Sequence, residues 1–349
     1  MCSDRTMATT GLEAGEAAGG TPTWVVKPAA NSNCGFGIQV CCALKEVLEV
    51  VDNAGSKTGR NGWVVQRYIE RPLLVQGRKF DIRMFVLLVA DPSTRSWRRR
   101  SKSTPPSSSK SCISTADGQL LQEPEGPHTE ESPAIERESA RGIQTGVGPS
   151  PLTAWCHHDA YVRMSSVKYS NDPEKAKDRF VHLTNNAVQR RSPSYGQDEP
   201  GNKLALENLQ EWLNGDGSSH KGKAIGWVEQ TMRPRMHAMV ATSIAAAAAA
   251  GINKYGRPYA FELLGYDFMV DDDLRVWLIE VNSNPCLEFV CPLLQDMITR
   301  VVDDALKTAV DPVFRPPEKH RTSKTLVSGG TSEVQTPVGG FSRVYPVVE

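Results

Sequence analysis

The chain has 349 residues, 39% of them hydrophobic, and its 40 basic and 40 acidic side chains give a formal net charge of +0. Such a length accommodates one large domain or two ordinary ones, and the balanced charge excludes a global attraction to nucleic acid or to an anionic membrane. The eight cysteines form no CxxC pair and residues 1–22 lack the apolar stretch of a secretory leader, which favours a reducing, intracellular compartment.

The beginning of the chain predicts a disordered lead-in, residues 1–22, followed by strands around a glycine-containing loop. A β-type run at 24–26 leads to Lys27 and then to a loop with Cys34 and Gly35. Glycine lets backbone amides approach a phosphate closely, and Lys27 would neutralise the phosphate charge. The same pattern is also typical of a plain hairpin turn.

Two further strands are predicted at 63–69 and 78–89. In the second one Lys79, Asp81 and Arg83 alternate with apolar residues, so these three charges share one face of the strand. The strand then continues into a fully apolar run, which predicts that it begins at a polar cleft and ends in the core. An internal ladder of salt bridges is the alternative, although it stabilises little for its desolvation cost.

The composition changes abruptly at 91–151, which is rich in Ser, Pro, Gly and charged residues and predicts a disordered insertion within the domain. Beyond it, residues 160–164 predict a strand with Arg163 pointing inward. Residues 180–186 predict a strand that ends at a cleft with polar groups, Thr184 and Asn185. Helices are predicted at 43–51, 204–213, 226–251 (with a tightly packed polyalanine stretch) and 293–310, and a flexible tail at 313–349.

The stretch 261–288 predicts a β-hairpin with an acidic turn at 271–273. Alternation places Glu280 and Asn282 on one face of the second strand, and Asp267 lies near the end of the first. Two carboxylates and a carboxamide in apolar strands predict a site for Mg²⁺, and a hairpin with a hydrated polar face is the alternative. A simple register leaves Asp267 a few residues from Glu280 along the ladder.

Taken together, these cations and oxygen ligands predict a nucleotide-dependent ligase. The chain has no GxxxxGK[ST] element and lacks the HRD and DFG motifs of protein kinases, so neither of those two site types applies.

Six ordered segments resemble the tubulin–tyrosine ligase-like family, from WVVKP with NSNCGFGI to FELLGYDFMV with WLIEVNSNPCLE. The segments between them are VVQRYIERPLLVQGRKFDIR, YVRMSS, HLTNNAVQ and GNK. The resemblance implies an α+β, ATP-grasp-type fold with mixed or antiparallel sheets flanked by helices, at 23–312. It also implies that the N-terminal part is incomplete, and Cys34 stands where relatives carry arginine.

The resemblance further implies a role for each matching position. ATP and Mg²⁺ would be the cofactors, and Arg83 and Arg163 would steady the γ-phosphate, the acyl-phosphate or the incoming amino acid. Asp267, Glu280 and Asn282 would hold Mg²⁺. The nucleotide would be contacted by Lys27, Cys34, Gly35, Gln66, Arg67, Tyr68, Ile69, Lys79, Asp81, Thr184 and Asn185.

The implied activity is ligation of an amino acid to the acidic tails of tubulin through an acyl-phosphate, with glutamylation expected first and tyrosination or glycylation as alternatives. A degenerate, non-catalytic microtubule-binding protein is the rival from another class.

The implied partners are tubulin or microtubules and a free amino acid such as glutamate, with no nucleic acid and no membrane. The implied location is the cytoplasm and cytoskeleton, including a cilium or flagellum. The candidates for docking the tail are Arg190, Arg191, Lys203 and Arg300.

Overall fold

The computed structural model describes residues 23–29, 37–53, 62–90, 152–170, 172, 175, 178–222, 224–252, 260–314 and 339–346. All of these residues belong to one compact structural unit. The lead-in at 1–22, the insertion at 91–151 and the residues Cys34 and Gly35 lie outside this part of the chain, so the predictions made for them stay predictions.

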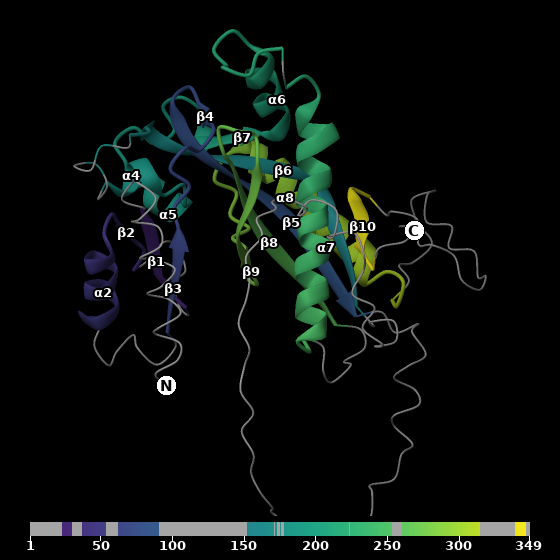
Figure 1. The fold of residues 1–349 in the computed structure, drawn as a ribbon. Helices are drawn as coiled ribbons and strands as arrows, with labels where there is room; N and C mark the ends of the chain where they lie inside the picture. The colour runs from purple at the N-terminus through teal and green to yellow at the C-terminus, as the bar shows by residue number, and fades with distance from the viewer. Residues whose placement is uncertain are drawn as a thin grey trace, which may run out of the picture. The chain divides into compact units, whose positions relative to one another are not determined.

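A seven-stranded antiparallel sheet forms the centre of the fold (Figure 1). Its main path runs β10-β6-β5-β8-β9, while β4 pairs with β5 and β7 with β6. Antiparallel pairing throughout the described strands confirms the α+β class. The strands are β4 (Leu74–Val75), β5 (Arg78–Ala90), β6 (Leu152–Lys168), β7 (Lys203–Ala205), β8 (Phe261–Val270), β9 (Val276–Asn282) and β10 (Phe341–Tyr345).

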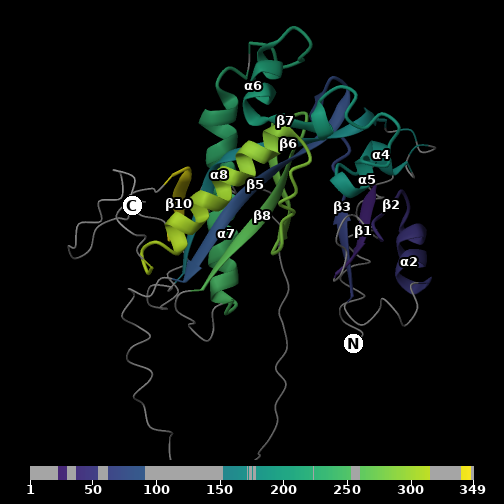
Figure 2. The same ribbon diagram turned by 180° about the vertical axis from the view of Figure 1, so that it is seen from behind.

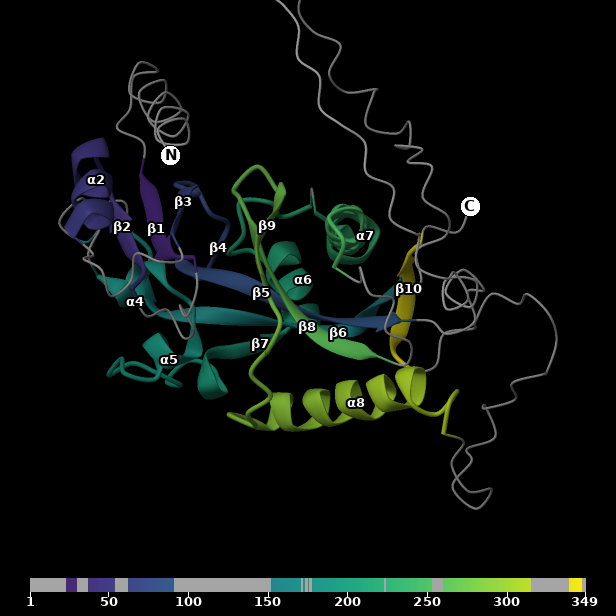
Figure 3. The ribbon, with the colours of Figure 1, turned by 90° about the horizontal axis from the view of Figure 1, so that it is seen from below.

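Helices cover both faces of this sheet, as Figures 2 and 3 show. Because successive side chains of a strand point to opposite faces, Ile82 and Met84 of β5 join one core, whereas Phe85 and Leu87 join another. The first core is closed by α6 (Leu206–Asn214), the π-helix η5 (Val228–Met232) and α7 (Arg233–Ala249), and the second by α8 (Pro292–Ala309). None of the described helices is long and apolar enough to cross a membrane.

A second sheet is small and has the order β2-β1-β3. It consists of β1 (Trp24–Pro28), β2 (Gln39–Cys41) and β3 (Trp63–Arg67), and α2 (Leu44–Asn53) packs on it. Val26, Cys41 and Val47 form its own small core. The small sheet therefore carries Lys27 and Arg67, whereas the other predicted charged residues of the site belong to the large sheet.

The segment 180–186 is not the predicted strand. It contains the short helices α4 (Arg179–His182) and α5 (Asn186–Gln189), with Thr184 and Asn185 in the connection between them. Asp178 caps α4 by accepting a hydrogen bond from the Phe180 backbone N–H, which favours a helical turn over an extended start.

Two other expectations from the sequence are wrong. Residues 341–345, inside the predicted flexible tail, form β10 on the edge of β6, and Phe341 is fully buried in the core beside α8. The polyalanine stretch is helical as predicted but is not tightly packed, because Ala245, Ala246, Ala249 and Ala250 are exposed. Helix propensity therefore explains these alanines better than packing does.

Candidate active site

A β-bulge sets the register of the β8–β9 hairpin. Phe268 pairs with Leu278, but the next pair is Asp267 with Glu280, so β9 contains one extra residue at this point. An uninterrupted ladder would place Glu280 on the opposite face from Asp267, since a shift of one residue changes the face. The simple register expected from the sequence is therefore wrong. The bulge brings the two carboxylates directly opposite each other.

The charged residues form two rows across the large sheet. In one row Lys203, Arg163 and Asp81 are successive cross-strand partners on β7, β6 and β5. In the other, Arg83, Asp267 and Glu280 are partners on β5, β8 and β9. Both rows lie on the same face of the sheet as the core that α8 closes. Along each strand their residues alternate with residues of the core that α6, η5 and α7 close.

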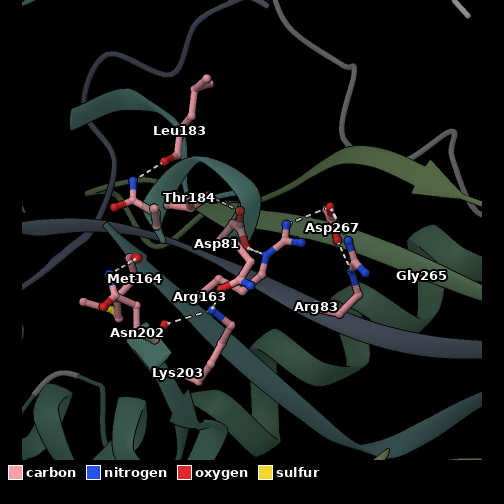
Figure 4. A network of polar contacts seen from close by, with 12 residues as sticks. Asp81, Arg83, Arg163, Met164, Leu183, Thr184, Asn202, Lys203, Gly265 and Asp267 are labelled. Carbon is pink, nitrogen blue, oxygen red and sulfur yellow. Dashed lines mark hydrogen bonds and ion pairs between the residues drawn. The ribbon is translucent and has the colours of Figure 1, made fainter. Parts of the chain in front are cut away.

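The two rows are joined by a buried ion network, drawn in Figure 4. Arg83 binds Asp267 with two nitrogens, and Arg163 bridges Asp81 and Asp267, with 2.7 Å between its NH2 and Asp267 Oδ2. Thr184 donates its hydroxyl to the second oxygen of Asp81. Burial alone would raise the pKa of Asp267, but Arg163 and Arg83 outweigh burial and hold this pKa below its ordinary value. Asp267 therefore stays ionised.

Glycine at position 265 allows Arg83 to lie flat over β8. A Cβ atom on Gly265 would come within 3.1 Å of an Arg83 guanidinium nitrogen and 2.9 Å of the Pro285 Cβ. A side chain here would push the guanidinium away from Asp267. Gly265 is not among the site residues predicted from the sequence, although a glycine inside a strand is a known signal of close approach.

The Thr184 segment is attached to the sheet by a buried glutamine. The Gln189 side-chain nitrogen donates to the backbone carbonyls of Phe180 and Leu183, while its oxygen accepts from the Ser166 N–H on β6. Gln189 has 0% exposure. It therefore holds the α4–α5 connection against β6 and keeps Thr184 beside Asp81.

Lys79 lies in a second cluster of buried, hydrogen-bonded side chains, and this cluster contains no carboxylate. Its Nζ donates to the Tyr68 hydroxyl at 2.9 Å and to the His182 backbone carbonyl at 3.0 Å, and the Tyr68 hydroxyl lies 2.8 Å from His182 Nδ1. Burial lowers the pKa of Lys79 to about 7, and the nearby Asp81 only partly opposes this shift. His182 is not among the site residues predicted from the sequence, although it lies in the segment HLTN.

If Lys79 binds a nucleotide phosphate, as expected from the sequence, its lowered pKa predicts a pH dependence of that binding. Phosphate stabilises the protonated amine, so binding raises the pKa of Lys79 and should take up close to one proton per nucleotide at about pH 8. Affinity should fall as pH rises above about 7, because the amine must then be protonated at a cost. Calorimetry in buffers with different ionisation enthalpies measures this uptake. In Lys79→Arg the uptake should disappear, and unchanged uptake in that variant would contradict the assignment.

The second row ends at Glu280 on β9. Lys27 of the small sheet and Asn282 of β9 lie beside this carboxylate. Lys27 Nζ lies 3.3 Å from Glu280 Oε2, and the Asn282 amide nitrogen lies 3.3 Å from both Asp267 Oδ2 and Glu280 Oε1. The described residues contain no cluster of three or more His, Cys, Asp or Glu side chains that could hold a metal. Two carboxylates and one amide nevertheless fit Mg²⁺, which typically binds one or two carboxylates and takes its other ligands from phosphates and water.

An open cavity of about 720 Å³, part of it open solvent, lies over these groups. Two predicted residues, Arg83 and Asn282, are outside its wall but contact Asp267, which lines it. The predicted residues in the wall are Lys27, Gln66, Arg67, Tyr68, Ile69, Lys79, Asp81, Arg163, Thr184, Asn185, Asp267 and Glu280.

The four tail-docking candidates do not form one exposed group. Arg190 and Arg191 are exposed, whereas Lys203 is only 4% exposed and so is not on the surface. Arg300 is exposed but pairs with Asp159 at 2.8 Å.

Cations and opposed carboxylates around one cavity are able to bind a polyanionic ligand together with a hard cation. The chain belongs to the tubulin-tyrosine ligase family, whose model matches residues 8–93 and 145–319.

Curated relatives include tubulin glycylase 3C of Tetrahymena thermophila, which is 26% identical over 92% of this chain and 24% of its own length. Tubulin monoglycylase TTLL3 of Danio rerio is 26% identical over 92% of this chain and 31% of its own length. Inactive polyglycylase TTLL10 of Homo sapiens is 28% identical over 83% of this chain and 35% of its own length. The chain thus spans about a quarter to a third of the length of these relatives.

Proposed function

We propose that this chain is an ATP- and Mg²⁺-dependent ligase, of the ATP-grasp type, that joins an amino acid to carboxylates of acidic tubulin tails. The observation that carries the proposal is the single cavity wall in which Lys27, Lys79 and Arg163 face the opposed carboxylates of Asp267 and Glu280. Family membership supports the same reaction class.

In this proposal the small sheet and the large sheet each supply a cation for the phosphates of ATP, Lys27 and Lys79. Gln66 and Arg67 at the end of β3, and the two residues after them, line the nucleotide side of the cavity. Asp267, Glu280 and Asn282 would hold Mg²⁺, and the ion would supply neutralisation of phosphate charge. Arg163, held between Asp81 and Asp267, and Arg83, which binds Asp267, lie ready to stabilise charge on the transferring phosphoryl group without reorganising.

The reaction proceeds in two steps. A carboxylate oxygen of the acceptor takes the γ-phosphoryl group of ATP and ADP leaves. The amine nitrogen of the incoming amino acid then forms a C–N bond with the acyl carbon, while the C–O bond to phosphate breaks and phosphate departs with the electron pair. The amine proton passes to solvent. No side chain of the protein becomes covalently attached, so positioning and charge neutralisation account for the acceleration.

Glycine is the amino acid that we propose first, in place of the glutamate expected from the sequence. The relatives just described carry glycylase names, and this is the specific observation that favours glycine. Glutamate and tyrosine are the next two candidates.

The test is incubation of the purified chain with tubulin, ATP, Mg²⁺ and one labelled amino acid at a time, followed by mass spectrometry of the tubulin tails. Label from glycine alone is the expected result. Label from glutamate or tyrosine would retain the ligase and correct the amino acid, and no label from any amino acid would overturn the ligase.

A non-catalytic homologue is the second candidate, favoured by the name of the inactive human relative. Thermal unfolding with ATP and Mg²⁺ separates the two readings, because a ligand at about 100 times its Kd stabilises the folded state by about 2.7 kcal/mol. A clear rise of the melting temperature with ATP supports the nucleotide site. A nucleotide-independent melting temperature together with retained microtubule binding would favour the non-catalytic reading.

A further inference from the structure

A row of buried hydrogen bonds connects Lys79 to helix α4. Lys79 Nζ lies 2.9 Å from the Tyr68 hydroxyl, and this hydroxyl lies 2.8 Å from His182 Nδ1. On the far side of the ring, His182 Nε2 lies 3.0 Å from the Lys175 backbone carbonyl. Tyr68, Lys79 and His182 are each less than 9% exposed, so the protein itself decides which atom of each pair donates.

The Lys175 carbonyl fixes the tautomer of His182. A carbonyl oxygen only accepts, so His182 Nε2 must carry a hydrogen. Burial, together with the Lys79 charge, lowers the pKa of His182, although the Lys175 carbonyl and Asp178 oppose this shift. The ring is therefore neutral at pH 7, and its Nδ1 carries no hydrogen and can only accept.

Tyr68 is the donor to this nitrogen. Tyr169 also lies against the His182 ring, but its hydroxyl donates to the Glu70 carbonyl at 3.0 Å. Burial raises the pKa of Tyr68 above its ordinary value, so the Tyr68 hydroxyl keeps its one hydrogen and gives it to His182 Nδ1. The lone pairs of the Tyr68 oxygen are consequently left for Lys79.

The contacts of Lys79 are therefore those that suit an ammonium group. Its Nζ donates to the Tyr68 oxygen and, at 3.0 Å, to the His182 backbone carbonyl, and it lies 4.3 Å from the centroid of the Tyr68 ring. These contacts act against burial, which lowers the pKa of Lys79 to about 7 and which Asp81 only partly opposes.

His182 also prevents the contact that would favour a neutral amine. A Tyr68 hydroxyl free to rotate could donate its hydrogen to an uncharged Lys79. In this structure such a rotation would leave the buried His182 Nδ1 without a donor, and an unsatisfied buried acceptor is costly. The neutral form of Lys79 is thus disfavoured through an atom that Lys79 does not itself contact.

We propose that Tyr68 and His182 are positioning residues that keep Lys79 in its ammonium form and directed at the nucleotide. The inference rests on the proposed ligase function, in which Lys79 binds the phosphates of ATP, and it adds the two residues that act through Lys79. Two hydrogens of the ammonium are bound by Tyr68 and by the His182 carbonyl, which leaves the third for a phosphate oxygen. All three residues line the same cavity.

The experiment measures the Kd of ATP with Mg²⁺ by calorimetry at pH 6 and at pH 8, for the wild type and for His182→Phe. The phenyl ring keeps the aromatic contacts with Tyr68 and Tyr169 but has no acceptor. The pKa of Lys79 should then fall by about one unit, the scale of a hydrogen bond to a charged group. Relative to the wild type, ATP should bind about tenfold more weakly at pH 8, where the amine must take up a proton, and almost equally well at pH 6. Comparison at the same pH cancels the titration of ATP itself.

Three further variants separate this role from packing. Tyr68→Phe should show the same dependence on pH, and adding His182→Phe to it should have no further effect, because His182 acts only through the hydroxyl. His182→Asn should restore the wild-type behaviour, since an amide oxygen can accept in place of Nδ1. Tyr169→Phe is the matched control, and it should bind ATP as the wild type does at both pH values.

Each outcome decides for or against the inference. An equal loss of affinity at pH 6 and pH 8 in His182→Phe would indicate a purely structural role and overturn it. Additive effects of the two substitutions would overturn it as well. If His182→Phe does not fold, Tyr68→Phe decides, and an unchanged pH dependence in that variant refutes the proposal. A wild type that binds no ATP at either pH would instead contradict the nucleotide site and the proposed function.

Discussion

Replacing Glu280 with glutamine is expected to lower ligation at least about 100-fold while the fold persists, since charge stabilisation in an active site is worth this much or more. The change keeps the size of the side chain but removes the negative charge opposite Asp267. The Glu280 side chain is 34% exposed and pairs with Lys27 at 3.3 Å, so the loss of this ion pair should cost at most about 1 kcal/mol of folding stability.

The measurement is the initial rate of ligation as a function of Mg²⁺ concentration, with thermal unfolding as the check on folding. Glu262→Gln, a change at an exposed glutamate on β8, is the matched control and should behave as the wild type. Wild-type ligation by Glu280→Gln, with an unchanged Mg²⁺ requirement, would remove Glu280 from the metal site.

Replacing Arg163 with methionine is expected to affect both stability and catalysis. Arg163 bridges Asp81 and Asp267, which are 7% and 2% exposed, so its removal leaves two buried carboxylates short of a partner. Breaking such a buried network typically costs about 3–5 kcal/mol of folding free energy. Ligation by the fraction that remains folded should fall about 100- to 1,000-fold, because a preorganised donor to the phosphoryl group is lost.

Urea unfolding measures the stability effect, and the control is Arg71→Met. Arg71 pairs with Asp273 at the surface, with exposures of 68% and 43%, and its removal should cost less than about 1 kcal/mol. The stability that comes from the lowered pKa of Asp267 is complete above the ordinary Asp value of about 4 and is lost as pH falls through the folded-state value. The penalty of Arg163→Met should therefore shrink in acid. An equal penalty for both arginine variants at neutral pH would contradict the assignment.

Much of the fold and of the site could be predicted because its signals are local. Alternation in β5 placed Lys79, Asp81 and Arg83 on one face, and all three lie buried beside the cavity or its network. The helices predicted at 43–51 and 293–310 match α2 and α8 to within a few residues, and the helix predicted at 226–251 spans η5 and α7 together. Short elements were less predictable, because α4 depends on a single capping contact and β10 is defined by its pairing with a distant strand.

The sequence by itself determined which chemistry is available: cations on β1, β5 and β6, two carboxylates and an amide on one hairpin, and the family to which these segments belong. Only the tertiary structure decided how these groups meet. The bulge that sets Asp267 opposite Glu280 shifts every later pair by one residue, and no local propensity specifies where such a shift occurs. The pairing of Lys203 with Arg163 joins two segments 40 positions apart, and burial among neutral oxygens is a property of that packing alone. Residue types follow from the sequence, whereas register and burial arise from contacts between strands that are remote along the chain.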